Sequence, residues 1–246
     1  MVEVRVRSVP TLSTPPLTVP QRYGLALHTS SPELGLAIAQ LSMEPANNCS
    51  KPTPVSNPFS REIRCQTWNL GRNLSTQLHP YLAEFLPPQT WSDLAWIAVA
   101  IGPGSFTGTR MGVVTARTLA QQLDIPLFGI STLKAAAWFH RQGNISCDRP
   151  IALQMPAQRG ELFVAIYSQN PEGGLTDWFS DRVVTPEIWQ EKLARFPDAF
   201  ELIQLEGGLG GLAVALVELA NLNWQCGLLP HWSEVLPFYG QHPVVI

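Results

Sequence analysis

Charged side chains are scarce in this chain. Only 14% of its 246 residues are Asp, Glu, Lys or Arg, and the formal net charge is −3, whereas globular proteins average about 25% charged residues. A chain with so few Lys and Arg is a poor candidate for binding nucleic acid through phosphates alone. Hydrophobic residues make up 45%, which is enough for a buried core, and the length predicts one large domain or two small ones.

Cysteines are also few, and long apolar runs are missing. The four cysteines lie far apart without a CxxC pair, which argues against a disulfide framework or a zinc ribbon and predicts a cytoplasmic location. The longest strongly apolar run, Leu94 to Ile101, has eight residues. It predicts a buried strand, because a membrane span needs about 20 residues. Residues 1–22 contain no apolar signal segment. We therefore expect no membrane role.

The periodicity of the first half predicts strands that alternate with helices. Residues 1–22 hold four prolines and are expected to form a disordered extension, and residues 44–60 a flexible loop. Between and after these segments, alternation and helical spacing predict an opening hairpin and then helices separated by strands. The predicted strands are 23–27, 34–41, 63–68, 95–101 and 126–130, and the predicted helices are 74–86, 106–122 and 132–142. This pattern favours an α/β fold with a mixed sheet.

A second unit repeats this layout from about residue 150. Strands are predicted at 151–155, 161–168, 178–184 and 199–205, and helices at 186–195 and 211–221. When the first hairpin is shifted by 128 positions, five of sixteen residues are identical. The identical residues are Leu25, Glu33, Leu34, Ala37 and Ile38, which align with Leu153, Glu161, Leu162, Ala165 and Ile166. The repeat is the outline of an actin-like (ASKHA, ribonuclease H-like) fold with lobes at 23–131 and 132–246 on either side of a cleft.

The sharpest motif is the run GPGSFTGTR at residues 102–110. It follows a predicted buried strand and opens a helix, and Ser105 or Thr107 is expected to cap that helix. The run is neither a Walker A loop nor GxGxxG. Two interpretations stay open: a tight structural turn, or a phosphate site made by backbone amides at the helix start.

Small residues recur every four positions along the helix that follows. Gly108, Gly112, Ala116 and Ala120 therefore share one face. Such a row lets another backbone approach closely, and glycine in a helix needs a packing reason because it costs about 1 kcal/mol relative to alanine. The row either packs on its own sheet or contacts a helix of a partner protein. In the second case, Gly112→Leu should abolish partner binding and leave the fold largely intact.

The segment 97–137 resembles the TsaB family, with IAVAIGPGSFTGTRMGVVTARTLAQQLDIPLFGISTLKAAA matching almost without gaps. Supporting stretches are LALHTSS (25–31), LSTQLHPYLAEFL (74–86), RGELFVAIY (159–167) and PFYG (237–240). The resemblance implies an actin-like fold, no catalysis of its own, and a heterodimer with the homologous catalytic subunit TsaD. Together with the TsaE ATPase, the pair would install threonylcarbamoyl on the tRNA adenosine next to the anticodon.

The resemblance also implies a partner surface on the helices 74–86 and 106–122, which would form a four-helix contact with TsaD. A homodimer through the same surface is expected when TsaD is absent, and tRNA is expected to be met only through the complex. No cofactor is expected. The residues expected at the partner surface are Leu78, Tyr81, Leu82, Phe106, Gly108, Thr109, Arg110, Gly112, Val113, Ala116 and Ala120.

Two departures argue against catalysis. TsaD carries two metal-binding histidines where this chain has Thr132 and Ala136, and neither side chain can replace imidazole as a metal ligand. The TsaB family usually has Asp at the ends of both first strands, where this chain has His28 and Pro156. Neither residue can hold Mg²⁺, so weak or absent binding of Mg-ATP is expected. The alternative is an actin-like ATPase or phosphotransferase that uses the GPGS turn.

Three further patterns are weaker. The run 208–213 fits GxGxxG/A, but no suitable acidic residue follows about 20 positions later, so a loop-to-helix turn is favoured over dinucleotide binding. The run around Ser105 lacks the GxSxG spacing of a hydrolase. The five histidines share no ligand spacing. Only His28 is singled out, because it falls at a cleft position.

Overall fold

Two β-sheets organise the chain in a computed structural model that describes residues 22–41, 62–143, 149–170, 173–238 and 240. The expected disordered extension, apart from Arg22, and the expected loop 44–60 lie outside these residues. Sheet A has the strand order β3-β2-β1-β4-β5, and sheet B has the order β8-β7-β6-β9. The strands are β1 Tyr23–His28, β2 Glu33–Gln40, β3 Ile63–Asn69, β4 Leu94–Ala100, β5 Leu127–Ile130, β6 Ile151–Pro156, β7 Leu162–Gln169, β8 Leu175–Val184 and β9 Glu201–Gln204.

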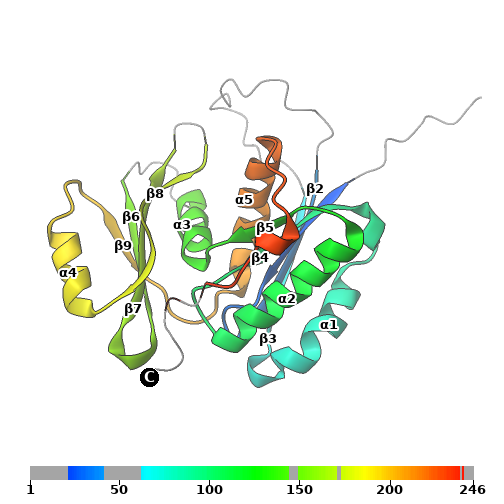
Figure 1. The fold of residues 1–246 in the computed structure, drawn as a ribbon, viewed down its shortest axis with the longest axis horizontal. Coiled ribbons are helices and arrows are strands. Elements are labelled where there is room, and N and C mark those ends of the chain that lie inside the picture. The colour runs from blue at the N-terminus through cyan, green and yellow to red at the C-terminus, as the bar shows by residue number, and fades with distance from the viewer. Residues whose placement is uncertain (1–21, 42–61, 144–148, 171–172, 239, 241–246) are drawn as a thin grey trace, which may run out of the picture.

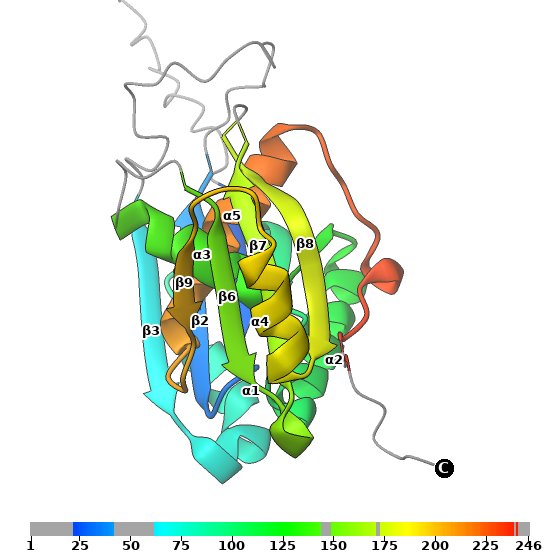
Figure 2. The ribbon, with the colours of Figure 1, turned by 90° about the vertical axis from the view of Figure 1, so that its left-hand side faces the viewer.

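Helices cover both sheets and fill the space between them (Figures 1 and 2). α1 and α2 lie on the outer face of sheet A, α3 and α5 lie between the sheets, and α4 lies on the outer face of sheet B (Figure 1). The α-helices are α1 Leu74–Phe85, α2 Phe106–Leu123, α3 Thr132–Gly143, α4 Pro186–Ala194 and α5 Ala213–Gln225. Short 3-10 turns at 71–73, 91–93, 158–160, 210–212 and 232–234 connect them.

The predicted duplication has a structural counterpart. β1 ends at His28 and β6 ends at Pro156. In both sheets, the first strand pairs antiparallel with the second and parallel with the strand after the first helix. The two hairpins at 23–40 and 151–169 are therefore equivalent, as the 128-residue shift predicts. The chain has the two-lobed, actin-like fold expected from the sequence.

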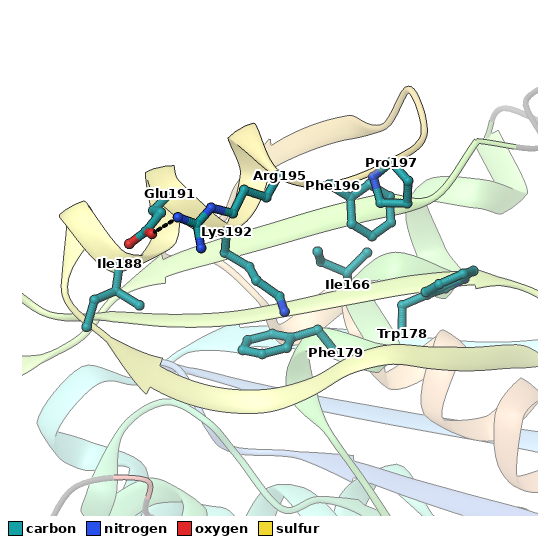
Figure 3. Close-up of a pocket in the computed structure, with 9 residues that line it drawn as sticks. All are labelled: Ile166, Trp178, Phe179, Ile188, Glu191, Lys192, Arg195, Phe196 and Pro197. Atoms are coloured by element: carbon teal, nitrogen blue, oxygen red, sulfur yellow. Dashed lines mark ion pairs between the residues drawn. The ribbon is translucent and has the colours of Figure 1, made fainter.

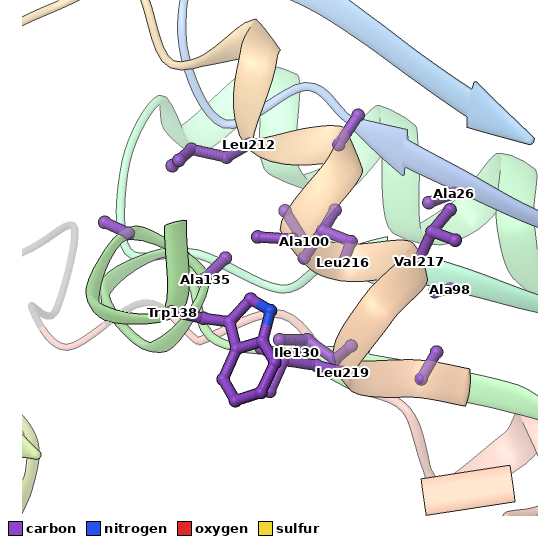
Figure 4. Close-up of a cluster of buried hydrophobic side chains, with 14 of the residues drawn as sticks. Ala26, Ala98, Ala100, Ile130, Ala135, Trp138, Leu212, Leu216, Val217 and Leu219 are labelled. Atoms are coloured by element: carbon purple, nitrogen blue, oxygen red, sulfur yellow. The ribbon is translucent and has the colours of Figure 1, made fainter. Parts of the chain in front are cut away.

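The alternation of side chains explains which helices meet sheet A. Leu25 and Leu27 point toward α1 and α2 and join the outer core. Ala26 and Ala98 point to the opposite face and let α5 come close, so that Leu216 and Val217 pack over them (Figure 4). β4 is buried along its whole length, because helices cover both of its faces.

The late helix α5 packs mainly on the early sheet. It contacts β1, β2 and β4, and Trp138 of α3 donates a hydrogen bond to Glu218 of α5 at 2.6 Å. The core between the sheets is therefore built from both halves of the chain. No helix in the described part of the chain combines the length and apolar character that a membrane crossing requires.

The predicted elements agree with the structure apart from their ends. α5 continues to Gln225, four residues beyond the predicted end at 221, and β8 begins at Leu175 rather than 178. Most residues of both extensions are exposed or only partly buried, so they add little to the periodic pattern from which the ends of an element are predicted.

Candidate partner-binding site

The GPGS motif forms a tight turn that packs on the connection between β1 and β2. The Ser105 amide donates to the Ser30 carbonyl at 2.7 Å, and a β-carbon at Gly104 would lie 2.1 Å from that same oxygen. Ser105, one of the two predicted caps, accepts a hydrogen bond from the Gly108 amide at 3.3 Å. These contacts favour the structural interpretation of the motif, because glycine and the cap are required for packing and helix initiation.

The row of small residues on α2 faces its own lobe, so the prediction that it contacts a partner is wrong. A β-carbon at Gly108 would lie 2.2 Å from the Thr29 carbonyl oxygen, and one at Gly112 would lie 2.1 Å from Thr29 Oγ1. Ala116 and Ala120 are fully buried in the core of lobe one. The expectation that Gly112→Leu would leave the fold intact is wrong for the same reason.

An apolar groove of about 500 Å³ runs between α1 and α2 on the outer face of the molecule. Val114, one of its wall residues, is 62% exposed. Aliphatic and aromatic side chains make up most of the walls. The lining residues are Ser75, Leu78, His79, Leu82, Trp91, Arg110, Met111, Val114, Thr115, Thr118 and Leu119.

Of the residues predicted at a partner surface, only Leu78, Leu82 and Arg110 line this groove. Phe106 and Thr109 instead line the cleft between the lobes. Tyr81 packs against Trp68 with ring centroids 4.9 Å apart. The remaining predicted residues are buried in the core of lobe one or against Thr29, namely Gly108, Gly112, Val113, Ala116 and Ala120.

Sequence reasoning missed most of the α2 wall, although a signal for it exists. Met111, Val114, Thr115, Thr118 and Leu119 follow the spacing i, i+3, i+4, i+7 and i+8, which defines one helix face. The small-residue row is buried in lobe one, whereas Met111 and Leu119 of the apolar row pack only partly against that core and also line the groove.

Two polar side chains mark positions in the groove. His79 of α1 and Thr115 of α2 lie 3.3 Å apart (Nε2 to Oγ1) and connect the two helices across its floor. At the N-terminal end of α2, the Arg110 guanidinium stacks over the Phe106 ring at 4.8 Å. The groove is thus apolar with an imidazole inside and a cation at one end.

A separate cleft of about 890 Å³ lies between the lobes. The GPGS turn and the ends of β1 and β6 meet there, through residues such as Ser30, Ser105 and Pro156. Glu206 is the single carboxylate among the residues that line it. An actin-like phosphotransferase needs carboxylates at the strand ends to hold Mg-nucleotide, and the residues present here do not fit that group.

His28 is completely buried rather than exposed in the cleft. Neither ring nitrogen has a hydrogen-bond partner among the described residues, and burial lowers its pKa from the ordinary 6.5 to about 4. Its register partner Gly35 lies against the carbonyl of Gly210, so lobe-two backbone covers this strand end. The imidazole is neutral at pH 7 and has no access to a ligand in the cleft.

The other candidate positions have structural roles. Thr132 and Ala136 are buried at the start of α3. The glycine-rich run 208–213 is a loop-to-helix turn, as expected, in which the Gly210 amide donates to the Glu33 carboxylate at 2.9 Å. Across the residues that the structure describes, no three His, Cys, Asp or Glu side chains gather in a metal-binding arrangement.

Comparison with known proteins identifies relatives by sequence. A family model for TsaD, the tRNA N6-adenosine threonylcarbamoyltransferase, matches residues 70–188. A Buchnera aphidicola protein named tRNA threonylcarbamoyladenosine biosynthesis protein TsaB is 48% identical over 149 residues, 61% of this chain and 68% of that protein. The Bacillus subtilis protein of that name is 43% identical over 103 residues, 41% of this chain and 42% of its own length. The Escherichia coli protein is 33% identical over 145 residues, 59% of this chain and 58% of its own length.

The match therefore spans about half the length of the B. subtilis and E. coli relatives. Among solved structures, a Pseudomonas aeruginosa protein described as similar to peptidase YeaZ superposes with a TM-score of 0.67. That comparison covers 89% of this chain and 100% of the other at 20% sequence identity. At this identity the likeness concerns the fold alone.

Proposed function

This chain belongs to the TsaB family, and from that premise we propose that it takes part in tRNA threonylcarbamoyladenosine biosynthesis as a non-catalytic subunit that binds a catalytic partner. The relatives carry the name of that pathway. The observation that carries the proposal is the open apolar groove between α1 and α2, with Val114 exposed in its wall. A contiguous exposed apolar surface of this kind marks a protein contact.

The proposed partner is a TsaD-like catalytic subunit, joined by a TsaE-like ATPase. The TsaD family model matches a segment that includes both α1 and α2, so a TsaD-like protein is expected to present a similar helix pair. Two similar pairs can pack their grooves against each other as four helices around a pseudo-twofold axis. The same self-complementarity predicts a homodimer of this chain when the partner is absent.

The lack of catalysis is proposed from the donor chemistry of the cleft. The two strand ends carry a buried neutral imidazole at His28 and a proline at Pro156. Neither can hold Mg²⁺ or act as a general base toward a ligand in the cleft. In this proposal the chain contacts tRNA only as part of the complex with the catalytic subunit, and the complex acts in the cytoplasm.

Binding to a tagged, co-expressed TsaD-like subunit tests the partner surface. Val114→Glu places a carboxylate in the wall of the groove, and we expect roughly a hundredfold weaker binding, because burying an unpaired charge under the partner costs several kcal/mol. Leu229→Glu is the matched control, since Leu229 is 67% exposed and lies outside the groove. Threonylcarbamoyl transfer by the reconstituted complex should fall with Val114→Glu and stay unchanged with Leu229→Glu. Equal binding by the two variants would refute the proposed surface.

Calorimetry with Mg-ATP on the isolated chain tests the alternative phosphotransferase function. We expect weak or no binding and no turnover. Tight binding of Mg-ATP accompanied by hydrolysis would contradict the non-catalytic role. It would not bear on the α1–α2 groove, which the binding experiment with the TsaD-like subunit tests.

A further inference from the structure

We propose that a second groove, on the outer face of sheet B, binds an acidic peptide segment of a partner protein, with a carboxylate side chain flanked by apolar ones. The groove has a volume of about 430 Å³ and lies between α4 and the β7–β8 strands. Figure 3 shows Ile166 at its floor, with Phe179, Trp178 and Phe196 around it and the Lys192 ammonium directed toward the Phe179 ring. This site is separate from the α1–α2 groove, which lies on the other lobe.

An incomplete helical layer creates the groove. Among the described residues, two helices, α1 and α2, cover the outer face of sheet A, but α4 alone covers that of sheet B (Figure 1). Trp189 of α4 is buried and seals the centre of the sheet. Trp178 on β8 and Ile188 on α4 each remain 55% exposed. A strip of apolar surface beside one helix is the kind of site in which a further segment of polypeptide packs.

Two cations in this region set the charge of the occupant. Lys192 Nζ lies 5.0 Å from the centroid of the Phe179 ring, and the Arg182 guanidinium carbon lies 5.4 Å from it. Within the described residues, the ion pairs are Lys134–Asp177, His140–Glu201 and Arg195–Glu191, and none neutralises Lys192 or Arg182. Lys192 is exposed in the free chain, and a bound segment whose apolar side chains cover the groove would reduce the water around a carboxylate paired with its ammonium group, which strengthens the interaction.

The distribution of acids favours a peptide over nucleic acid. Glu191 lines the groove and is paired with Arg195, Glu187 lies one turn earlier on α4, and Asp198 follows the helix. A polyphosphate chain carries a charge at every nucleotide and would meet these acids along its length, whereas a peptide with one carboxylate needs only one cation. Binding of single-stranded nucleic acid requires a row of cations beside the stacking aromatics. One carboxylate between apolar side chains matches the Lys192 ammonium, which lies between the apolar walls of the groove, with Arg182 beside the Phe179 ring as a second cation nearby.

Fluorescence anisotropy with two labelled pentapeptides tests the proposal. The acidic probe is Leu-Phe-Glu-Phe-Leu and its uncharged match is Leu-Phe-Gln-Phe-Leu, both blocked at their ends. We expect the acidic probe to bind at least tenfold more tightly than the amide probe. Lys192→Glu should lower the affinity for the acidic probe by a factor of about ten or more, since it replaces attraction between charges by repulsion. Arg72→Glu, an exposed charge reversal on lobe one, should change nothing.

Further variants show whether the charge of Lys192, and not a change in folding, sets the affinity for the acidic probe. Lys192 is exposed, so Lys192→Glu should keep the circular dichroism spectrum and the urea midpoint of the parent, and Lys192→Gln should give an intermediate affinity. Val114→Glu should leave probe binding unchanged, which distinguishes the failure of this inference from the failure of the proposed partner surface. Equal affinities for the two probes, no binding of the acidic probe, or insensitivity to Lys192→Glu would overturn the proposal. Tighter binding of oligoadenylate with the same dependence on Lys192 would also overturn it, in favour of nucleic acid.

Discussion

The buried His28 makes a quantitative prediction about stability and pH. Its pKa is lowered from 6.5 to about 4 by burial alone, so between these values the unfolded chain binds a proton that the folded chain does not. Stability is therefore fully present above pH 6.5 and is lost as the pH falls toward 4. Since each pKa unit corresponds to about 1.36 kcal/mol, the whole shift is worth roughly 3 kcal/mol.

Replacing His28 by an uncharged residue should remove this loss. Between pH 7.5 and 4.5 the linkage relation assigns roughly 2–3 kcal/mol of the parent's destabilisation to His28. His28→Leu and His28→Gln should both lack this contribution to the loss of stability between the two pH values. At pH 7.5, His28→Leu should be neutral or more stable by about 1–3 kcal/mol, because it eliminates two buried nitrogens without partners among the described residues.

Urea unfolding at the two pH values measures the effect as a difference between variants. Groups that both proteins share, such as the buried carboxyls with raised pKa values at Asp181 and Glu218, cancel in that difference. His231→Gln, at an exposed histidine, is the control and should keep the full acid-dependent loss. If His28→Leu loses as much stability as the parent between pH 7.5 and 4.5, the imidazole protonates in the folded state and the argument from its burial is refuted.

Three further predictions concern packing and hydrogen bonds. Burial raises the pKa of Glu218, so its contribution to stability is lost as the pH rises through the folded-state value. Glu218→Gln, which can still accept the Trp138 hydrogen bond, should show a smaller decline between pH 5 and 8 in urea unfolding. Ser105→Ala should cost about 1 kcal/mol through loss of the helix cap, measured by thermal unfolding, with no effect from Thr107→Ala. Gly112→Leu should destabilise the fold by about 1–3 kcal/mol or more through overpacking, and a urea midpoint equal to the parent's would contradict the close approach of α2 to Thr29.

Local patterns predicted the elements of this protein well. Helical spacing at Leu74, Leu78, Leu82 and Phe85 identified the buried face of α1, and the apolar run before the GPGS turn identified β4. These patterns succeed because burial on one side imposes a period on the sequence of a helix or strand. The duplicated layout then indicated two lobes, and the resemblance of segment 97–137 indicated the family.

The site was predicted less well, and the small-residue row shows why. Gly108 and Gly112 indicate that some backbone or side chain packs closely against α2. They do not indicate whether that neighbour belongs to the same chain or to a partner protein. The neighbour is Thr29 of the same lobe, 79 residues earlier than Gly108. The groove proposed as the partner surface is formed instead by residues of α1 and α2 that come together only after folding.

The sequence by itself determined the order and type of the helices and strands, the fold class, the glycine-rich turn before α2, and the absence of carboxylates at positions 28 and 156, because each depends on residue identity or on short-range spacing. Only the tertiary structure decided that the small-residue row is internal, that lobe-two backbone covers the strand end beside His28, and that both lobes have open grooves on their outer faces. Those outcomes depend on which surfaces meet when distant segments pack, and the free energy of such packing is a property of pairs of surfaces rather than of either segment alone.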